Sequence, residues 1–554
     1  MRHLNIFASS VRLSCFAVVA VLFVGCGGNG AGSPTAAVEI GGPSGTELAV
    51  DQTLHVGNGT GPQTLDPHRA EGVPSSNILR DLFEGLTLEA PDGSVVPGAA
   101  ESWDISADGL VYTFYLREDA QWSNSDPVTA EDFVFSLRRS VDPATMSHYS
   151  SILEPIVNAM AVITGKKSPA ELGVEALDAL TLVIRLQRPT AYFPGLLTHS
   201  TMYPVHRASV EQYGNQFARE GRLIGNGAYT LNEWVVQSHI KLIRNKFYRD
   251  DVNTTIDSVY YYPIESQDAE LKRFRADELD ITEEIPYQQL TWIRENLGDQ
   301  LVISPYLGSY YFGFNMTREP FQNNPQLRRA LSLAIDREII TSRITNAGEL
   351  PAFGWVPQVA NYSPVVPEWA GWSQAERDVE AQRLYAEAGY SADKPLKIEL
   401  LYNTSANHKR LSVAIASMWK QTLGVETELL NQEWKVFLET RQLKKTTQVF
   451  RGGWIGDYND AFTFSQLMHS ANAMNHPGYS SPRYDELIER AAGETNLSTR
   501  ADILNQAERV LLEDMPIIPV YFYVSKHLVK SWVGGRKPNI MDHHYTKNFY
   551  ILKH

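Results

Sequence analysis

The sequence contains few residues whose types and spacing support catalysis. Gly165-Lys166-Lys167-Ser168 is similar to part of a phosphate-binding loop, but Met160 stands where that loop needs its first glycine, and Lys167 replaces the required serine or threonine. His543 and His544 are adjacent, a spacing that metal sites do not use, so we expect them on the surface. Neither G-x-S-x-G nor H-E-x-x-H occurs. We therefore expect no catalytic residue, no metal, no cofactor and no enzyme activity. The alternative is an exported hydrolase, and turnover of a peptide by the protein would support it.

Cys26 is the residue with the clearest chemistry. A basic start with Arg2 and Arg12 precedes the apolar run 13–24, which is too short to span a bilayer, so residues 1–25 are predicted to be a secretory signal. Gly25-Cys26 resembles the lipobox of bacterial lipoproteins, where the cysteine thiol is acylated, although Phe23 stands where that motif usually has leucine. The alternative is an ordinary cleaved signal with an incidental cysteine. We expect an exported protein, lipid-anchored at Cys26 on the periplasmic face of a bacterial membrane.

The segment after the signal and the net charge restrict the partners. Residues 26–52 are poor in large apolar side chains, which is typical of a flexible tether. Removing the signal takes away two arginines and no acid, so the formal net charge changes from −15 to −17. This charge disfavours nucleic acid and anionic lipid surfaces. Cys15 and Cys26 are the only cysteines, so the mature protein is expected to have no disulfide and to depend on core packing.

The first half of the chain has mixed α and β patterns. Residues 53–58 are predicted to form a strand, and residues 75–86 a helix with Ser75 or Ser76 as its N-cap. Asp108-Gly109 lies between alternating apolar segments and predicts a hairpin. A capping box at 129–132 predicts the start of another helix.

The second half has the pattern of a separate α/β lobe. A strand region at 301–315 is followed by a predicted helix over 326–345 and by a capping box at 373–376 that starts another helix. Strand 396–402, helix 408–422 and strand 425–431 alternate as a βαβ crossover does. The carboxyl end returns to strand character from residue 516. We expect it to pack on the first domain, so that more than one crossing joins the lobes and acts as a hinge.

Several stretches resemble the oligopeptide-binding proteins of bacterial oligopeptide permeases, within the extracellular solute-binding proteins of family 5. The resemblance covers almost the whole chain after the tether. The stretches are Gln63 to Trp103, Leu116 to Pro143, Pro305 to Asn315, Leu400 to Leu411, Arg451 to Asp460 and Leu528 to Gly535.

The resemblance implies an α/β, two-lobed periplasmic-binding-protein (Venus flytrap) fold, with an extra α+β domain inserted in the first lobe. The expected domains are lobe I (53–83, 208–307 and 524–554), inserted domain II (84–207) and lobe III (308–523). The implied function is a substrate-binding protein of an ABC importer that captures oligopeptides between its lobes. Its expected partners are short peptides and the permease with its ATPase subunits. We expect a monomer whose lobes close on the ligand.

A receptor for many peptides must recognise what all peptides share, namely the backbone and the two charged ends. Asp457 matches the carboxylate that binds the peptide α-ammonium in the family; the alternative is that it caps the turn at 458–460. An extended peptide can be held by strand addition to protein edges. The residues that match those edges are Glu71, Gly72 and Val73 on one lobe and Gly453, Trp454 and Ile455 on the other.

Further positions match the walls of the family's binding site. His408, Arg441 and Arg451 match positive groups that meet the peptide carboxylate or offset pocket acids, and Glu71 is expected to balance one of the arginines. A lobe-bridging salt link is the alternative for Arg441. Four aromatic residues match the walls of the family's side-chain pockets: Tyr149, Tyr311, Trp434 and Trp454. These pockets are expected to be roomy and hydrated, which implies low specificity.

The sequence also departs from the family pattern. Family members often have a disulfide between the positions of Gly308 and Ile455. Thr345 stands where a lysine can receive the carboxylate of short ligands, and Gly313 where a glutamate lines a pocket. The preferred peptides, a nutrient role against a murein-peptide or signalling role, the membrane leaflet and the cognate permease are not fixed by the sequence.

Overall fold

The computed structural model describes residues 47–359, 361–444 and 448–554. The predicted signal, Cys26 and most of the predicted tether lie outside these ranges. Leu48 and Ala49 are described, and they pair with the carboxyl end: Leu48 forms a bridge with Leu552, and the Ala49 N–H donates to the Ile551 carbonyl at 2.9 Å. The folded unit therefore begins before residue 52, where the tether was expected to end. No helix within the described ranges has both the length and the apolar character to cross a bilayer.

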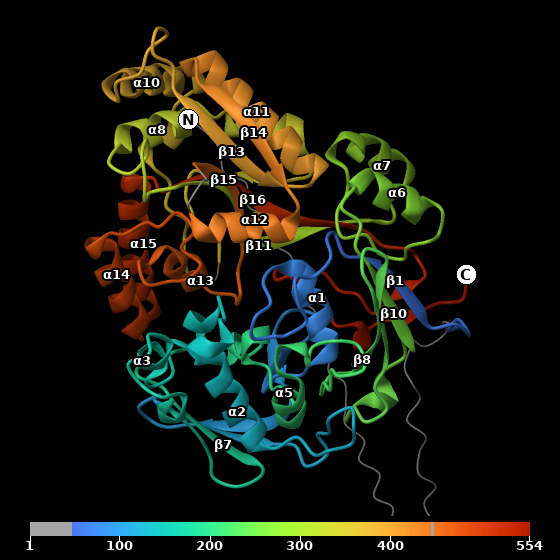
Figure 1. Cartoon of the computed structure of the whole chain (residues 1–554). Helices are drawn as coiled ribbons and strands as arrows, with labels where there is room; N and C mark the ends of the chain where they lie inside the picture. The colour runs from blue at the N-terminus through green and yellow to red at the C-terminus, as the bar shows by residue number, and fades with distance from the viewer. Residues whose placement is uncertain (1–46, 360, 445–447) are drawn as a thin grey trace, which may run out of the picture. The chain divides into compact units, whose positions relative to one another are not determined.

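The first sheet joins segments far apart in the sequence. Its order is β1-β10-β9-β8, with β1 parallel to β10 and the other pairs antiparallel. Figure 1 shows β1 (blue) beside β10 (green), with the carboxyl-terminal segment near both. The strands are β1 Thr53–Gly57, β8 Tyr229–Val235, β9 His239–Arg244 and β10 Ser258–Tyr262. Its helices are α1 Val73–Leu82, α5 Arg207–Tyr213, α6 Gln267–Arg275 and α7 Leu290–Asn296.

A second, antiparallel sheet lies between these segments in the sequence and has its own core around Trp122 and Phe133. The hairpin expected around Asp108-Gly109 is confirmed as β4 and β5, and the capping box at 129–132 starts α2. The strands are β4 Ala100–Ile105, β5 Val111–Leu116, β6 Val174–Ala176 and β7 Thr181–Arg185, and β2 Thr87–Glu89 pairs with β3 Val95–Pro97. The helices are α2 Ala130–Val141, α3 Ala159–Ile163 and α4 Phe193–Leu196.

The third sheet has six strands in the order β12-β16-β11-β15-β13-β14. The predicted βαβ unit is confirmed, because β13 and β14 are parallel and α11 joins them. The strands are β11 Leu301–Phe314, β12 Leu350–Pro351, β13 Lys397–Asn403, β14 Glu426–Gln432, β15 Val449–Ile455 and β16 Ile517–Leu528. The helices are α8 Pro325–Leu333, α9 Arg337–Ile339, α10 Gln374–Glu387, α11 Ala406–Leu423, α12 Trp434–Leu443, α13 Phe462–Ser465, α14 Pro482–Gly493 and α15 Leu497–Asp514.

Two sequence-based helix predictions need correction. The helix expected over 326–345 is broken, because the buried Arg337 guanidinium donates to the carbonyls of Ser332 and Ile335 and so satisfies the end of α8. The chain then continues as α9 and a π-helical turn, 340–345. The helix expected from Ser75 begins earlier, at Val73, because Pro74 is favourable in a first turn and Gly72 is the N-cap.

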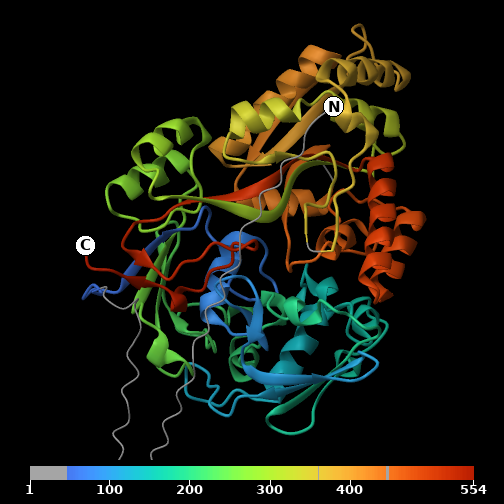
Figure 2. The ribbon, with the colours of Figure 1, turned by 180° about the vertical axis from the view of Figure 1, so that it is seen from behind.

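The long strands β11 and β16 run side by side, as Figures 1 and 2 show. Their register is continuous from Leu301 to Pro305 and resumes at Ser309, and a second shift lies between Tyr310 and Tyr311. At one end Leu528 packs in the core of α6 and α7, while at the other Ile518 packs in the core of the six-stranded sheet. The carboxyl end continues through β17 Val533–Gly534 and β18 Tyr550–Ile551 and packs beside β1, as expected from the sequence.

Candidate functional site

One cavity of about 350 Å³ is lined by residues of the first sheet, of the six-stranded sheet and of the segment 149–203. This volume is in the range of small-molecule ligand sites. All thirteen ligand-binding residues predicted from the sequence line this cavity: Glu71, Gly72, Val73, Tyr149, Tyr311, His408, Trp434, Arg441, Arg451, Gly453, Trp454, Ile455 and Asp457.

Asp457 is a mostly buried acid without a cationic partner in the described ranges. Its side chain is 10% exposed, and the nearest basic atom in the described part of the chain is Nε2 of His199, 3.5 Å away. Burial raises the pKa of Asp457 to about 8 and lowers the pKa of His199 to about 3, so the imidazole is neutral at pH 7. The turn-capping alternative applies to Asp460 instead, which accepts the Phe462 N–H at 2.8 Å and pairs with Arg500. The Asp457 carboxyl can therefore accept a cation from a ligand.

The predicted positive groups differ in their partners. Arg451 donates to the Tyr523 hydroxyl at 2.9 Å and lies over the Tyr310 ring. Arg441 lies over the Phe437 ring, and its Nε has no hydrogen-bond partner in the described ranges. Neither arginine has an ion pair among the described residues, so the lobe-bridging salt link considered for Arg441 is absent there.

We expected Glu71 to balance one of the arginines, but in the described residues it forms no ion pair with an arginine. Its carboxylate lies 2.7 Å from Nδ1 of His148. This contact with the carboxylate raises the pKa of His148. His408 is buried, and burial together with the nearby Arg451 holds its pKa well below the usual value, so it faces the cavity as a neutral imidazole.

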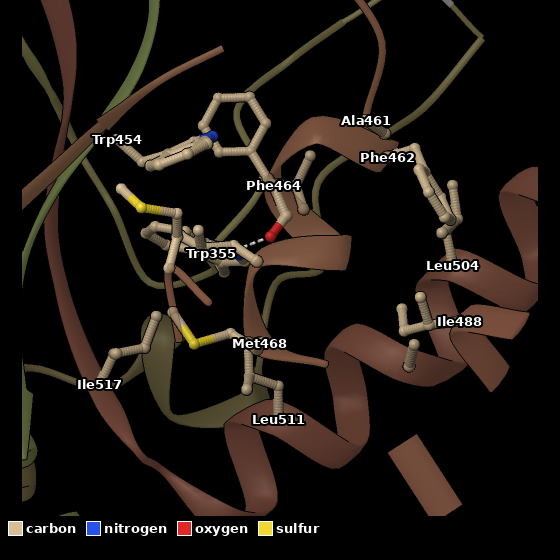
Figure 3. Close-up of a cluster of buried hydrophobic side chains, with 14 of the residues drawn as sticks. Trp355, Trp454, Ala461, Phe462, Phe464, Met468, Ile488, Leu504, Leu511 and Ile517 are labelled. Carbon is tan, nitrogen blue, oxygen red and sulfur yellow. Dashed lines mark hydrogen bonds between the residues drawn. The ribbon is translucent and has the colours of Figure 1, made fainter. Parts of the chain in front are cut away.

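The predicted aromatic walls are also part of the protein core. Trp454 stacks on Tyr149 with ring centroids 6.2 Å apart and packs with Trp355 and Phe464. Figure 3 shows Trp355, Trp454 and Phe464 together, with the Trp355 indole N–H bonded to the Phe464 carbonyl at 2.8 Å. Trp434 packs in parallel on Phe437 at 5.9 Å. These walls are fixed by core packing before any ligand arrives.

The strand that carries the predicted edge has one free side. β15 pairs with β11 along Gly308–Phe314, but it pairs with β13 only through Val449 and Phe450. In the described residues, 451–455 therefore have no strand partner on the β13 side, and residues of this segment line the cavity. An extended ligand backbone can add to such an edge.

A model of bacterial extracellular solute-binding proteins, family 5, matches residues 94–476. The chain belongs to this family. It is 44% identical to the periplasmic oligopeptide-binding protein OppA of Escherichia coli over 517 residues, covering 92% of this chain and 95% of the relative. It is 40% identical to the murein peptide-binding protein MppA of the same species, covering 92% and 95%.

Solved structures of family 5 proteins have the same fold. The E. coli murein tripeptide-binding protein MppA superimposes with a TM-score of 0.90 at 39% identity, over 92% of this chain and 100% of that chain. Haemophilus influenzae OppA in complex with RPPGFSPFR gives 0.89 at 38% identity, over 92% and 100%. The predicted two-lobed α/β fold is confirmed.

A second MppA structure distinguishes this conformation from an open one. The unliganded open form of that family 5 protein gives a TM-score of only 0.65 at the same 39% identity. Because the identities are equal, the lower score reflects a different conformation. The cavity described above thus belongs to a conformation other than that open form.

The departures from the family 5 pattern have clear structural counterparts. Gly308 lies directly opposite Ile455 in the β11–β15 ladder, and Ile455 Cδ1 would be 2.5 Å from a Cβ at Gly308, so the isoleucine fills the place of a disulfide. A Cβ at Gly313 would lie 2.3 Å from the Phe450 ring, and Thr345 is fully buried. Neither Gly313 nor Thr345 lines the cavity.

Several cavity residues were missed by the sequence analysis. His199 and His476 line the cavity but lie in irregular segments, where no periodic pattern marks an inward-facing side chain. His543 and His544, which we expected on the surface, are mostly buried and line it too. His543 pairs with Glu89 at 2.6 Å, and His544 pairs with Asp542 at 2.9 Å. Neither pair forms a motif that the sequence alone would reveal.

Proposed function

We propose that this chain captures oligopeptides between its two lobes and delivers them to an ABC permease, as a protein held to the membrane by a lipid on Cys26. The proposed domain boundaries are those given by the resemblance: 53–83, 208–307 and 524–554 for lobe I, 84–207 for domain II and 308–523 for lobe III. The related OppA structure in complex with a peptide supports the ligand class.

The observation that carries the proposal is Asp457. Without a cation nearby, burial keeps the Asp457 carboxyl protonated below about pH 8, and a ligand cation would favour its charged form. A peptide α-ammonium would supply the missing cation, while the free side of 451–455 would bind the following backbone. The two features together favour a ligand that has a cationic end followed by an extended amide chain.

Blocking the peptide amine tests this assignment. We expect a tetrapeptide with a free amine to bind at least thirtyfold more tightly than its N-acetylated form, because acetylation removes the charge that pairs with Asp457. Isothermal titration calorimetry with the purified protein measures both affinities. Equal affinities would contradict the role of Asp457, and hydrolysis of the peptide during the titration would contradict a pure binding function.

The burial of Asp457 also makes closure of the unliganded protein depend on pH. Its pKa is about 8 in this conformation, against about 4 for a hydrated aspartate. The closed form therefore binds a proton that the open form releases between pH 4 and 8. Closure without ligand is favoured as the pH falls from 8 towards 4, and this contribution is lost as the pH rises through 8. Small-angle X-ray scattering should show a smaller radius of gyration for the unliganded protein at pH 5 than at pH 8. An unchanged radius would contradict this coupling.

A murein peptide is the second candidate ligand. The similarity to MppA in sequence and structure supports it, since the chain is 40% identical to that protein. Competition between a murein tripeptide and ordinary tri- to pentapeptides distinguishes the two roles. Displacement of bound murein tripeptide only by other murein peptides would favour the specialised role.

A further inference from the structure

Domain II and lobe III exchange tyrosine side chains beside the ligand cavity. Tyr192 belongs to the sequence of domain II, yet its ring packs against the lobe III core that contains Trp355. Tyr458 belongs to lobe III, yet it is 2% exposed and packs in the domain II core around Trp122. Neither ring can keep this environment when domain II and lobe III separate. The exchanged pair is therefore a feature of the closed conformation.

The Tyr192 ring lies in a slot formed by three side chains of lobe III. It is parallel to the Tyr458 ring, with an interplanar angle of 3° and centroids 4.9 Å apart, and it stacks on Phe462 with centroids 5.6 Å apart. The Arg500 guanidinium lies over it, 5.1 Å from its centroid. Aromatic pairs and cation–π contacts are favourable at such separations. Tyr192 thus makes oriented contacts with the opposite lobe in addition to burying apolar surface.

The slot is held in shape by bonds within lobe III. Two guanidinium nitrogens of Arg500 donate to the two carboxylate oxygens of Asp460, each at 2.8 Å. The Gln466 amide donates to the Tyr458 hydroxyl at 3.1 Å, and the Asp460 N–H donates to the Tyr458 carbonyl at 2.8 Å. Because these bonds do not involve domain II, they can persist when domain II moves away. The slot is then ready to receive Tyr192 on closure.

The slot and the proposed ammonium receptor belong to one turn. Asp457 directly precedes Tyr458, and the Asp457 N–H donates to Oγ1 of Thr463 at 3.0 Å. Domain II approaches the same turn with a second side chain, since Nε2 of His199 lies 3.5 Å from the Asp457 carboxyl. Domain II therefore covers Asp457 and places Tyr192 against the next residue. Enclosure of Asp457 and insertion of Tyr192 are parts of one movement.

We propose that Tyr192 is a positioning residue for peptide binding, a latch that retains domain II on lobe III after the peptide has entered. The inference rests on the proposed peptide-binding function. The latch contacts form only when domain II meets lobe III, so they do not help a peptide to enter the open protein. They oppose the reopening through which a bound peptide leaves. Tyr192 should thus control the dissociation rate and leave the association rate unchanged.

The variant Tyr192→Ala tests the latch. We expect a free-amine tetrapeptide to dissociate about tenfold faster or more, while its association rate stays within about twofold of the wild-type value. Stopped-flow tryptophan fluorescence of the full chain measures both rates, because Trp434 and Trp454 line the cavity. Tyr192→Phe keeps the ring and the ring contacts described above. Its dissociation rate should therefore remain within about threefold of the wild-type value.

Tyr115 provides a matched control within domain II. It is 37% exposed on β5, and its hydroxyl donates to Asp104 of the neighbouring β4 at 2.9 Å. Tyr115→Ala removes the same kind of side chain from the outer surface, so both rates should be unchanged. Thermal unfolding checks that each variant is folded. If Tyr192→Ala does not unfold cooperatively, Tyr192→Leu, which keeps an apolar side chain without a ring, replaces it with the same expected result.

A double variant tests whether the effect passes through Tyr458. In a Tyr458→Ala background the stacking partner is already absent, so Tyr192→Ala should accelerate dissociation by a smaller factor than in the wild-type protein. An equal factor in both backgrounds would mean that Tyr192 acts independently of Tyr458, and would overturn the latch.

The remaining outcomes separate this inference from the proposed function. Failure of the tetrapeptide to bind the wild-type protein would overturn the proposed function and this inference with it. Binding in which Tyr192→Ala leaves the dissociation rate unchanged, or lowers affinity mainly by slowing association, would overturn only the inference. A Tyr192→Phe variant as defective as Tyr192→Ala would also overturn it, since the effect would then belong to the hydroxyl and not to the stacked ring.

Discussion

Replacing Asp457 with asparagine is expected to weaken binding of a free-amine tetrapeptide by roughly thirtyfold to several thousandfold. The substitution removes one partner of an enclosed charge pair, which costs about 2–5 kcal/mol. Asparagine keeps the size of the side chain, so the cavity shape should be preserved. Calorimetry at pH 7 measures the loss.

The N-acetylated tetrapeptide is the matched control for this variant. Because it has no ammonium, its affinity should be nearly the same for the wild-type protein and for Asp457→Asn. A double-mutant cycle over the two proteins and two peptides then isolates the ion pair. An equal loss for both peptides would mean that asparagine disturbs the site in general, and would remove Asp457 from the role of ammonium receptor.

The second large effect is expected at Gly72, where two parts of the cavity wall touch. Gly72 has φ 79° and ψ 161°, a region that is essentially restricted to glycine. A Cβ at this position would lie 2.9 Å from Cζ2 of Trp434, which is closer than real contacts allow. The change Gly72→Ala should therefore oppose the conformation in which these residues meet. We expect tetrapeptide affinity to fall about tenfold to a hundredfold, which corresponds to about 1.4–2.7 kcal/mol.

Gly221 provides the matched control for Gly72. It also has a positive φ, 72°, but a Cβ there would have no neighbour within 4 Å. Gly221→Ala should cost some stability through backbone strain and leave peptide affinity unchanged. The loss of affinity caused by Gly72→Ala should be smaller in a Trp434→Ala background than in the wild-type protein. No recovery in this double variant would contradict a steric role for the contact.

Much of the architecture was predictable because its signals are local. The capping box at 129–132, the hairpin at Asp108-Gly109 and the βαβ unit at 396–431 each depend on neighbouring residues, and all are present in the structure. The break between α8 and α9 was not predictable. It depends on Arg337, which also donates to the carbonyls of Ala352 and Pro519, and these are distant in the sequence.

The site shows the same division. The residues proposed from the resemblance line one cavity, but spacing alone would not have grouped Glu71 with Asp457. The partner of Glu71 was missed, because His148 lies in an irregular segment with no pattern to mark it. His476 was missed for the same reason.

The interruption in the ladder between β11 and β16 has a mechanical consequence. Tyr306, Leu307 and Gly308 have no paired partner on β16, and this interruption is longer than the second register shift, between Tyr310 and Tyr311. Bending is easiest where a ladder is interrupted. Opening and closing should thus be a rotation about these three residues, with amide protons before and after them remaining protected from exchange. Tyr306 also lines the cavity, so the pivot itself is within reach of the cargo.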